Sequence, residues 1–278
     1  MSTLHLLRAL NREDASVAGA VRRALPAIAR AVDATVRAIC AGGHLFYVGA
    51  GTSGRLAALD AAECPPTFGT SPKQVQAVLA GGRGALTGAV EGAEDSAANG
   101  ARDLKRRGVS ARDVVVGIAA SGDTPYVLGA LAYAKRLGAV TVAVTSNRGS
   151  ALERRARIAI VVETGPEALT GSTRLKAGTA QKMVLNLLST ATMTRLGRVY
   201  DNWMIGVALT NRKLQARGLR ILSEASGAEV SQAAHALRQS RHDLRVALIM
   251  LKAGVNAAEA RRRLRRAGGQ LLRALGEK

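Results

Sequence analysis

Aromatic residues are scarce in this chain: phenylalanine, tyrosine and tryptophan together make up 3% of its 278 residues. Proteins that bind single-stranded nucleic acid stack its bases on aromatic rings, so this scarcity disfavours that class. No stretch approaches ~18 consecutive apolar residues, which excludes a predicted transmembrane helix. The first residues alternate apolar and charged side chains without a signal-peptide pattern. We therefore expect a cytoplasmic protein that is not bound to a membrane.

Cysteine and histidine are also sparse. The two cysteines, Cys40 and Cys64, do not form a CxxC motif, and the four histidines are scattered without an HExxH motif. Such a pattern predicts neither a disulfide scaffold nor a zinc site. We expect no metal and no organic cofactor.

Acidic residues are few, 20 against 40 lysines and arginines, which gives a formal net charge of +20. A basic chain attracts anions such as nucleic acid, acidic membrane surfaces or phosphorylated substrates. The alternative is a biased amino-acid usage distributed over solvated faces. We favour this alternative because the few aromatic residues are not interleaved with the basic ones. A nucleic-acid partner is therefore not expected.

Apolar residues account for 47% of the chain, enough for one large core, or for one core and a small satellite domain. In the first part of the chain, short apolar runs typical of buried strands alternate with segments of helical periodicity. Strands are expected at residues 45–48, 75–79, 113–119, 139–144 and 158–162, and helices at residues 13–41, 85–107, 124–136 and from 53 onward. This alternation predicts an α/β fold with a parallel sheet between layers of helices.

The second part of the chain is expected to be helical. Long helices are predicted at residues 173–197 and 204–224, and several short helices within residues 228–276. The break at Gly227 suggests a domain boundary. We therefore predict an α/β domain at residues 1–225 and a small helical domain at residues 226–278.

A glycine-rich turn, GAGTSG at residues 49–54, follows the first predicted strand and opens a helix. The free N–H groups of a helix N-terminus bind anions at such a turn. A dinucleotide site would require an acidic residue at the end of the second strand, but residues 79–82 contain none. Arg83 leaves NADP binding open. The hydroxyls of Thr52 and Ser53 suit a phosphate monoester better.

A second loop of this kind follows the predicted strand at residues 113–119. Ser121 and Thr124 supply hydroxyl donors for anionic oxygens, and Pro125 suits the first turn of a helix. Taken alone, this loop is an ordinary helix cap. Two such loops at the carboxyl ends of parallel strands are more specific, because open α/β sheets bind ligands there.

Several carboxylates lie near these loops in the sequence. Glu91 and Glu94 are three residues apart, which places them on one face if their segment is helical. Glu63 lies on the helix predicted after the first loop. Paired carboxylates divide acid and base roles when their environments differ. The alternative is a solvated acidic patch at a helix start.

The polar segment LTGSTRLKAGTAQK, residues 169–182, precedes a long predicted helix. Ser172 or Thr173 is expected to cap that helix. Arg174 and Lys176 would then lie in its first turn, where positive charge opposes the helix dipole. A bound anion or a facing carboxylate would offset this repulsion.

The chain closely resembles the N-acetylmuramic acid 6-phosphate etherases in several long motifs. They are GAGTSGRL, DAAECPPTFG, EGAEDS, DVVVGIAASGDTPYV, LTGSTRLKAGTAQKMVLNLLST and NRKLQARG. The resemblance extends from about residue 3 to the C-terminus. It implies the sugar isomerase (SIS) superfamily, an α/β sandwich that binds phosphosugars, with a small C-terminal helical domain similar to ubiquitin-associated (UBA) folds. It also implies a homodimer.

The resemblance implies hydrolytic loss of D-lactate from the 3-O position of N-acetylmuramic acid 6-phosphate, which leaves N-acetylglucosamine 6-phosphate, in cell-wall amino-sugar recycling. The family's functional glutamates correspond to Glu63 and Glu94, and its phosphate contacts to Thr52, Ser53, Ser121 and Thr124. Ala58 and Ala62 replace a usual glycine and serine, and Asp123 replaces an arginine often seen in AASGRTPY. The last change removes a positive charge from a loop that is expected to hold phosphate.

This reaction suits two carboxyl groups. In the open-chain aldehyde, the C2 proton is acidified and the C3 ether lies β to the carbonyl. A base removes the C2 proton, an acid protonates the departing lactate oxygen, and water then adds to the unsaturated aldehyde. No metal or organic cofactor is needed.

One continuous helix from Ser53 to Glu63 would separate these residues by about 15 Å at 1.5 Å rise per residue. Either the helix breaks early, which Pro65 favours, or another subunit completes the site. The competing hypothesis is a sugar-phosphate-sensing SIS regulator without catalysis. A repressor of that type usually carries a DNA-binding module before the SIS domain, but mostly one predicted helix precedes the first strand here.

Overall fold

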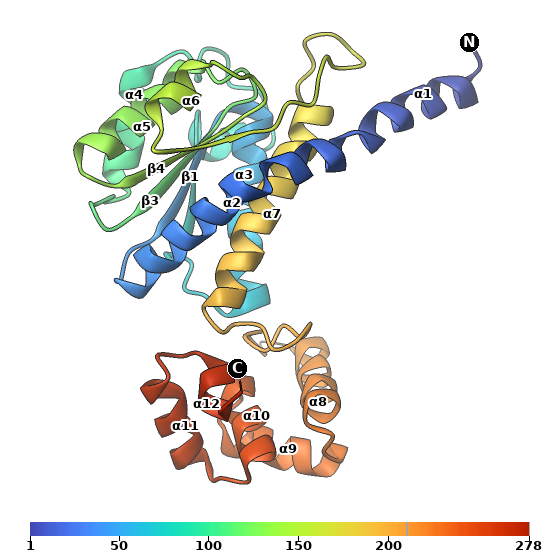
Figure 1. The fold of residues 1–278 in the computed structure, drawn as a ribbon, viewed down its shortest axis with the longest axis vertical. Helices are drawn as coiled ribbons and strands as arrows, with labels where there is room; N and C mark the ends of the chain where they lie inside the picture. Colours follow the sequence, from blue (N-terminus) through green and yellow to red (C-terminus); the bar gives the residue numbers. More distant parts are fainter. Residues whose placement is uncertain (210, 278) are drawn as a thin grey trace. The chain divides into compact units, whose positions relative to one another are not determined.

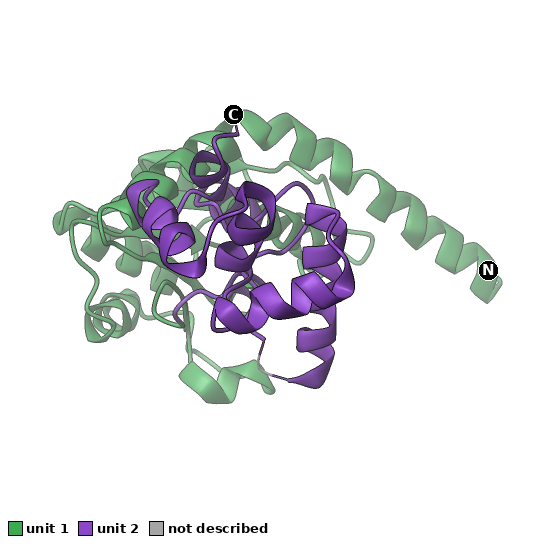
Figure 2. Ribbon diagram, turned by 90° about the horizontal axis from the view of Figure 1, so that it is seen from below, with its two compact units in different colours: residues 1–62, 72–189 green, residues 63–71, 190–278 purple. Residues whose placement is uncertain are grey.

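A computed structural model describes residues 1–209 and 211–277 of the chain (Figure 1). These residues pack into two compact units, which Figure 2 distinguishes by colour. Unit 1 comprises Met1–Ala62 and Pro72–Ser189, and unit 2 comprises Glu63–Ser71 and Thr190–Lys278. This division differs from the predicted boundary at residue 225, because the helix that ends at Ser226 packs against the helices that follow it.

Unit 1 is built on a five-stranded parallel sheet with the strand order β2-β1-β3-β4-β5. The strands are β1 (Leu45–Gly49), β2 (Val75–Leu79), β3 (Val114–Ile118), β4 (Val140–Thr145) and β5 (Ile158–Val161). Every residue of β1 and β3 is buried, as expected for central strands covered on both faces. The predicted α/β fold and its five strands are confirmed.

Helices cover both faces of this sheet (Figure 1). The α-helices that lie wholly or partly in unit 1 are α1 (Thr3–Ala15), α2 (Val17–Cys40), α3 (Gly51–Phe68), α4 (Ala97–Arg106), α5 (Pro125–Arg136), α6 (Ala151–Arg155) and α7 (Lys176–Arg195). Helices α4, α5 and α6 form one apolar core with side chains such as Phe46 and Val48 of β1. Tyr47 lies between these two residues and points to the opposite face, because side chains alternate along a strand.

The first helical segment differs from its prediction. Residues 13–41 do not form one helix: α1 (Thr3–Ala15) ends before Ser16, and α2 begins after it. The Ser16 hydroxyl donates a hydrogen bond of 2.7 Å to the Glu13 carbonyl. Side-chain hydrogen bonds of this kind compete with the regular helical pattern and bend helices. Glu13 therefore lies in the last turn of a helix and does not begin one.

The helix predicted at residues 85–107 is also shorter than expected. A 3-10 helix, η1 (Gly82–Leu86), is followed by turns, and α4 begins only at Ala97. Gly81, Gly82 and Gly92 have positive φ angles of 80°, 67° and 68°. Such angles are incompatible with a regular right-handed helix, and glycine adopts them without a steric penalty.

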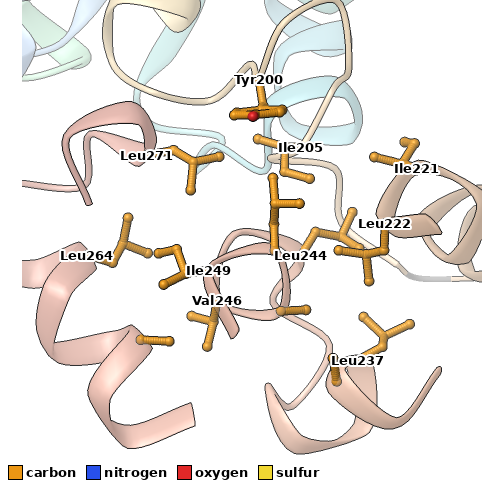
Figure 3. Packing of buried hydrophobic residues seen from close by; sticks show 14 of the residues in the cluster. Tyr200, Ile205, Ile221, Leu222, Leu237, Leu244, Val246, Ile249, Leu264 and Leu271 are labelled. Atoms are coloured by element: carbon orange, nitrogen blue, oxygen red, sulfur yellow. The ribbon is translucent and has the colours of Figure 1, made fainter. Parts of the chain in front are cut away.

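Five helices lie wholly within the described residues of unit 2: α8 (Arg212–Ser226), α9 (Val230–Gln239), α10 (Leu244–Ala253), α11 (Ala257–Arg266) and α12 (Leu271–Leu275). They pack around one apolar core, and Figure 3 shows Leu222, Leu244 and Ile249 meeting there. Full burial of such a side chain contributes about 1.5–3 kcal/mol. The predicted break at Gly227 is confirmed, because its φ of 73° ends α8. None of the helices in the described residues has the length and apolar character required to cross a bilayer.

The buried carboxyl group of Asp60 links helices α3 and α7 to strand β1. Asp60 of α3 is 6% exposed. Its two oxygens accept hydrogen bonds from the Tyr47 hydroxyl at 3.0 Å, the Asn186 amide at 2.8 Å and the Ser189 hydroxyl at 3.0 Å. Burial raises the pKa of Asp60, although these hydrogen bonds act in the opposite direction.

We expect Asp60→Ala to lower the free energy of unfolding by about 3 kcal/mol or more, because three donors lose an acceptor and each such loss costs about 1–3 kcal/mol. Asp60→Asn, which keeps one acceptor oxygen, should lose less. Because the folded-state pKa is raised, the folded protein binds this proton more tightly and loses stability as pH rises through that pKa. Urea titrations between acidic and neutral pH should show this loss in the native protein relative to Asp60→Asn. Parallel pH profiles for the two proteins would contradict it.

Candidate functional site

The loops after β1 and β3 emerge next to each other at the carboxyl edge of the sheet. Gly49 of β1 pairs with Ile118 of β3 in the parallel register, so both strands end at the same level. Gly54 permits α3 to start directly against the strands: a Cβ at this position would lie 2.1 Å from Leu79 Cδ1 and 2.7 Å from the Gly49 oxygen. The first loop therefore places the N-terminus of α3 at the edge where open sheets bind ligands.

The two predicted phosphate contacts of the first loop differ in accessibility. Thr52 is half-buried, whereas Ser53 is 9% exposed. Thr52 faces the start of α7, because a Cβ at Gly178 would lie 3.4 Å from Thr52 Cγ2. A role for both hydroxyls in phosphate binding stays a prediction.

The second loop, which carries Ser121 and Thr124, packs closely against the loop after β4. Gly122 has a φ of +75°, and a Cβ there would lie 2.3 Å from Ser150 Oγ. Ser121 is exposed, and its Oγ accepts a hydrogen bond of 3.3 Å from the Asp123 amide. The Asp123 carboxylate accepts one of 3.0 Å from the Ala151 amide, in the first turn of α6. Thr124 is the N-cap residue of α5, and within the described part of the chain its side chain makes no capping hydrogen bond.

Glu94 lies beside this second loop, although it precedes Ser121 by 27 positions in the sequence. Its carbonyl accepts a hydrogen bond of 3.0 Å from the Tyr126 amide at the start of α5. Two glycines allow α4 and α5 to pack this closely: a Cβ at Gly100 would lie 1.9 Å from the Tyr126 oxygen, and one at Gly129 would lie 2.0 Å from the Ala97 oxygen. The carboxylate of Glu94 belongs to an exposed turn and not to a helix.

A cavity of about 290 Å³ joins Glu94 to the first loop. We call it the Glu94 cavity. Its lining comprises Ala50, Gly51, Arg55, Ala80, Ala85 and residues 89–95, which include Glu91 and Glu94. Arg55 stabilises one wall of this cavity, because its Nε and Nη2 donate hydrogen bonds to the Ala85 and Gly88 carbonyls at 2.9 and 2.7 Å. A predicted proton-transfer residue thus shares a cavity with the N-terminal end of α3.

A second cavity, of about 620 Å³, lies at the ends of β3, β4 and β5. We call it the Ser121 cavity. Its lining comprises Ala120, Ser121, Ser146, Asn147, Arg148, residues 163–167, Thr173 and Ala177. Most of these side chains are polar, and three of them are charged. The sequence pattern indicated Ser121 but did not indicate Asn147, Arg148 or Glu163, because these three residues lie outside the recognised motifs.

Glu63 is an exposed residue of α3. Of the two alternatives left open by the sequence, an early break of this helix is excluded: α3 continues to Phe68 with Pro65 and Pro66 inside it. Cys64 and Phe68, four residues apart on one side of the helix, are both buried, and this packing outweighs the local preference of the prolines. Glu63 belongs to unit 2 and Glu94 to unit 1, and their joint action stays a prediction.

The start of α7 is capped differently from the prediction. Helix α7 begins at Lys176, so neither Ser172 nor Thr173 is the residue that directly precedes it. The Glu167 carboxylate accepts hydrogen bonds of 2.9 Å from the amides of Lys176 and Ala177. A second carboxylate, Glu13, approaches the buried Lys176 ammonium at 2.6 Å, and this contact lowers the pKa of Glu13. Of the two alternatives, a bound anion or a facing carboxylate, the facing carboxylate is present, although the sequence carries no local sign of it.

The described residues contain no group of three or more histidine, cysteine, aspartate or glutamate side chains arranged to hold a metal ion. The side chains and backbone groups at the carboxyl edge provide hydroxyl and amide donors, arginine and carboxylates. Such a set can bind an anion and transfer protons.

Comparison with known families places this edge within a known domain. Residues 27–135 match the glucokinase regulatory protein N-terminal SIS domain, and residues 96–191 match the SIS domain. Among solved structures, a phosphoheptose isomerase from Francisella tularensis is similar, with a TM-score of 0.52, 19% identity and coverage of 70% of this chain and 100% of that one. One from Neisseria gonorrhoeae has a TM-score of 0.50, 15% identity and coverage of 69% and 99%. At these identities, the likeness shows the fold alone.

Curated relatives are much more similar. An N-acetylmuramic acid 6-phosphate etherase from Serratia proteamaculans is 54% identical over 275 residues, which cover 99% of this chain and 93% of the relative. One from Yersinia pestis is 53% identical with the same coverage. The predicted SIS fold and the sequence resemblance are both confirmed, and the chain belongs to the N-acetylmuramic acid 6-phosphate etherase family.

Proposed function

We propose that this protein is an N-acetylmuramic acid 6-phosphate etherase that releases D-lactate and leaves N-acetylglucosamine 6-phosphate. The observation that carries the proposal is the Glu94 cavity, in which a carboxylate lies with the N-terminal end of α3 at the carboxyl edge of the sheet. An acid/base residue beside an anion-binding helix start is what elimination from a sugar phosphate requires. The identity to curated etherases supports the same conclusion.

The proposed mechanism is elimination followed by addition of water, which makes the protein a carbon–oxygen lyase. The phosphate is held by the hydroxyls of Thr52, Ser53, Ser121 and Thr124. Glu94 and Glu63 divide the proton transfers: one removes the C2 proton of the open-chain aldehyde, and the other protonates the lactate oxygen as the C3–O bond breaks. Water then adds at C3 and a proton returns to C2. The residues in these roles transfer protons without a metal or an organic cofactor.

The protein is proposed to act as a homodimer. Helix α3 is continuous, so Glu63 lies about 15 Å along it from Ser53 at 1.5 Å rise per residue. A sugar anchored at the first loop is therefore served more readily by a glutamate from another subunit. Helix α1 supports association of two copies, because it contains no buried residue and leaves Leu4, Leu6 and Leu7 exposed.

We place the reaction in the cytoplasm, in the recycling of peptidoglycan amino sugars. Its substrate class supports this placement, because a phosphorylated amino sugar is charged and does not diffuse through a bilayer. The matched curated relatives carry the same substrate in their names.

Incubation with N-acetylmuramic acid 6-phosphate tests the function directly. We expect one equivalent each of D-lactate and N-acetylglucosamine 6-phosphate. In D₂O the product should carry deuterium at C2, because elimination removes that proton and addition replaces it from solvent. A protein that binds the sugar phosphate but releases no lactate would instead be the sensing regulator, and a product without deuterium would contradict the elimination mechanism.

Ser53→Ala and Ser121→Ala are each expected to weaken binding of N-acetylglucosamine 6-phosphate by about 10–100-fold, because a hydrogen bond to a charged group contributes about 1.5–3 kcal/mol. Isothermal titration calorimetry measures this change. Thr194→Ala removes an exposed hydroxyl from the far end of α7 and serves as the control. Unchanged affinity in both serine variants would exclude these hydroxyls as phosphate contacts.

A further inference from the structure

Arg148 is the single cation among the residues that line the Ser121 cavity. It follows β4, and its guanidinium contacts Glu163, which follows β5. Arg148 Nη2 and Nε lie 2.7 and 3.2 Å from the same carboxylate oxygen, Glu163 Oε2. The two side chains are 66% and 51% exposed. An ion pair this exposed contributes little to stability, so a ligand can replace Glu163 as the partner of Arg148.

The rest of the cavity is suited to an anion. Ser121 Oγ accepts a hydrogen bond from the Asp123 amide, which leaves its hydroxyl proton free to be donated to a ligand. Asn147 Nδ2 donates to the Ser121 carbonyl at 3.3 Å. This contact holds the loops after β3 and β4 together, so Ser121 and Arg148 form part of one wall.

The neighbouring carboxylates are engaged elsewhere. Asp123 accepts a hydrogen bond from the Ala151 amide, and Glu167 accepts two from the first amides of α7. Glu163 is therefore the carboxylate that an incoming anion has to displace. Because arginine offers two parallel N–H donors, it can bind two oxygens of a phosphate at once.

We infer that Arg148 is a binding residue for the 6-phosphate of the sugar, and that its guanidinium exchanges Glu163 for the phosphate when the ligand enters the Ser121 cavity. The inference rests on the proposed function for the identity of the ligand. It adds a positive charge from the loop after β4 to Ser121, the proposed phosphate contact that lines this cavity. Glu163 acts as an internal competitor for that charge.

The substrate carries a second anion, the lactyl carboxylate. The phosphate is favoured, because Ser121 donates from the same wall and the lining adds the hydroxyls of Ser146, Thr164 and Thr173. A phosphate has three terminal oxygens and can use this many donors. N-acetylglucosamine 6-phosphate has no lactyl group, so it probes the phosphate alone.

Calorimetric titration with N-acetylglucosamine 6-phosphate tests the inference on the intact protein. We expect Arg148→Gln to weaken binding by about tenfold or more, the range of a lost charge-assisted hydrogen bond. Glu163→Gln should tighten binding, because the competitor is removed. Arg148→Lys should restore part of the loss. Arg136→Gln, which removes the same charge from the exposed end of α5, controls for the net charge of the protein.

Each outcome separates the alternatives. Unchanged affinity in Arg148→Gln overturns the inference. If that affinity is unchanged but KM for N-acetylmuramic acid 6-phosphate rises, Arg148 holds the lactyl carboxylate and the inference is again overturned. Equal weakening by Arg148→Gln and Glu163→Gln indicates a merely structural ion pair and also overturns it. If binding depends on Arg148 as expected but no D-lactate is released, the proposed catalysis fails while the phosphate contact stands.

Discussion

Glu94→Gln is expected to lower the rate of D-lactate release by about 10²–10⁴-fold, the usual contribution of one positioned proton transfer. Glutamine keeps the size and polarity of the side chain but neither accepts nor donates the proton at the reacting carbon or oxygen. Because Glu94 is exposed in a turn whose backbone is held by Tyr126, the substitution should leave the fold intact. Steady-state kinetics with an enzymatic lactate assay, alongside a thermal unfolding curve, measures both.

Glu91→Gln is the matched control for this experiment. Glu91 lies three residues earlier, lines the same cavity and is also exposed, but the proposed mechanism gives it no role. Binding of N-acetylglucosamine 6-phosphate should persist in Glu94→Gln, because the loss concerns proton transfer and not phosphate contacts. Near-normal turnover in Glu94→Gln, or an equal loss in Glu91→Gln, would remove Glu94 from the mechanism.

Glu63→Gln is expected to be as inactive as Glu94→Gln, and a mixture of the two inactive proteins should regain activity. If each site takes one glutamate from each subunit, a mixed dimer has one intact site and one site with both substitutions. Random exchange then gives about one quarter of the native activity, because half of the dimers are mixed and half of their sites are intact. The recovery should develop with time after mixing, at the rate of subunit exchange.

Size-exclusion chromatography with light scattering sets the reference for the mixing experiment, because subunit exchange requires a dimer. A mixture of either variant with buffer alone provides the baseline. A mixture that stays inactive after full exchange would mean that both glutamates of a site come from one chain. A fully active monomer would end the proposal that a second subunit completes the site.

The carboxyl edge of the sheet was predictable from the sequence because its signals are local. A buried parallel strand needs a continuous apolar run, as Val114 to Ile118 shows, and a helix that starts directly after a strand needs glycine, as Gly54 shows. These requirements act within a few residues, so the five strands and the two hydroxyl-bearing loops could be located without coordinates. Resemblance to the family's motifs added Glu63 and Glu94 as functional residues. The residue pattern alone left open the alternative that these carboxylates form a solvated acidic patch.

Contacts between distant residues could be decided only by the tertiary structure. Lys176 meets Glu13 across 163 positions, and Asp60 meets Ser189 across 129. Tertiary packing outweighed the conformational preference of the local sequence at two places. Helix α3 continues through Pro65, and the backbone of the turn that carries Glu94 is held by the amide of Tyr126. The pairing of Arg148 with Glu163 has the same origin. It exists because β4 and β5 are neighbours in the sheet, and strand order is set by the packing of the whole unit.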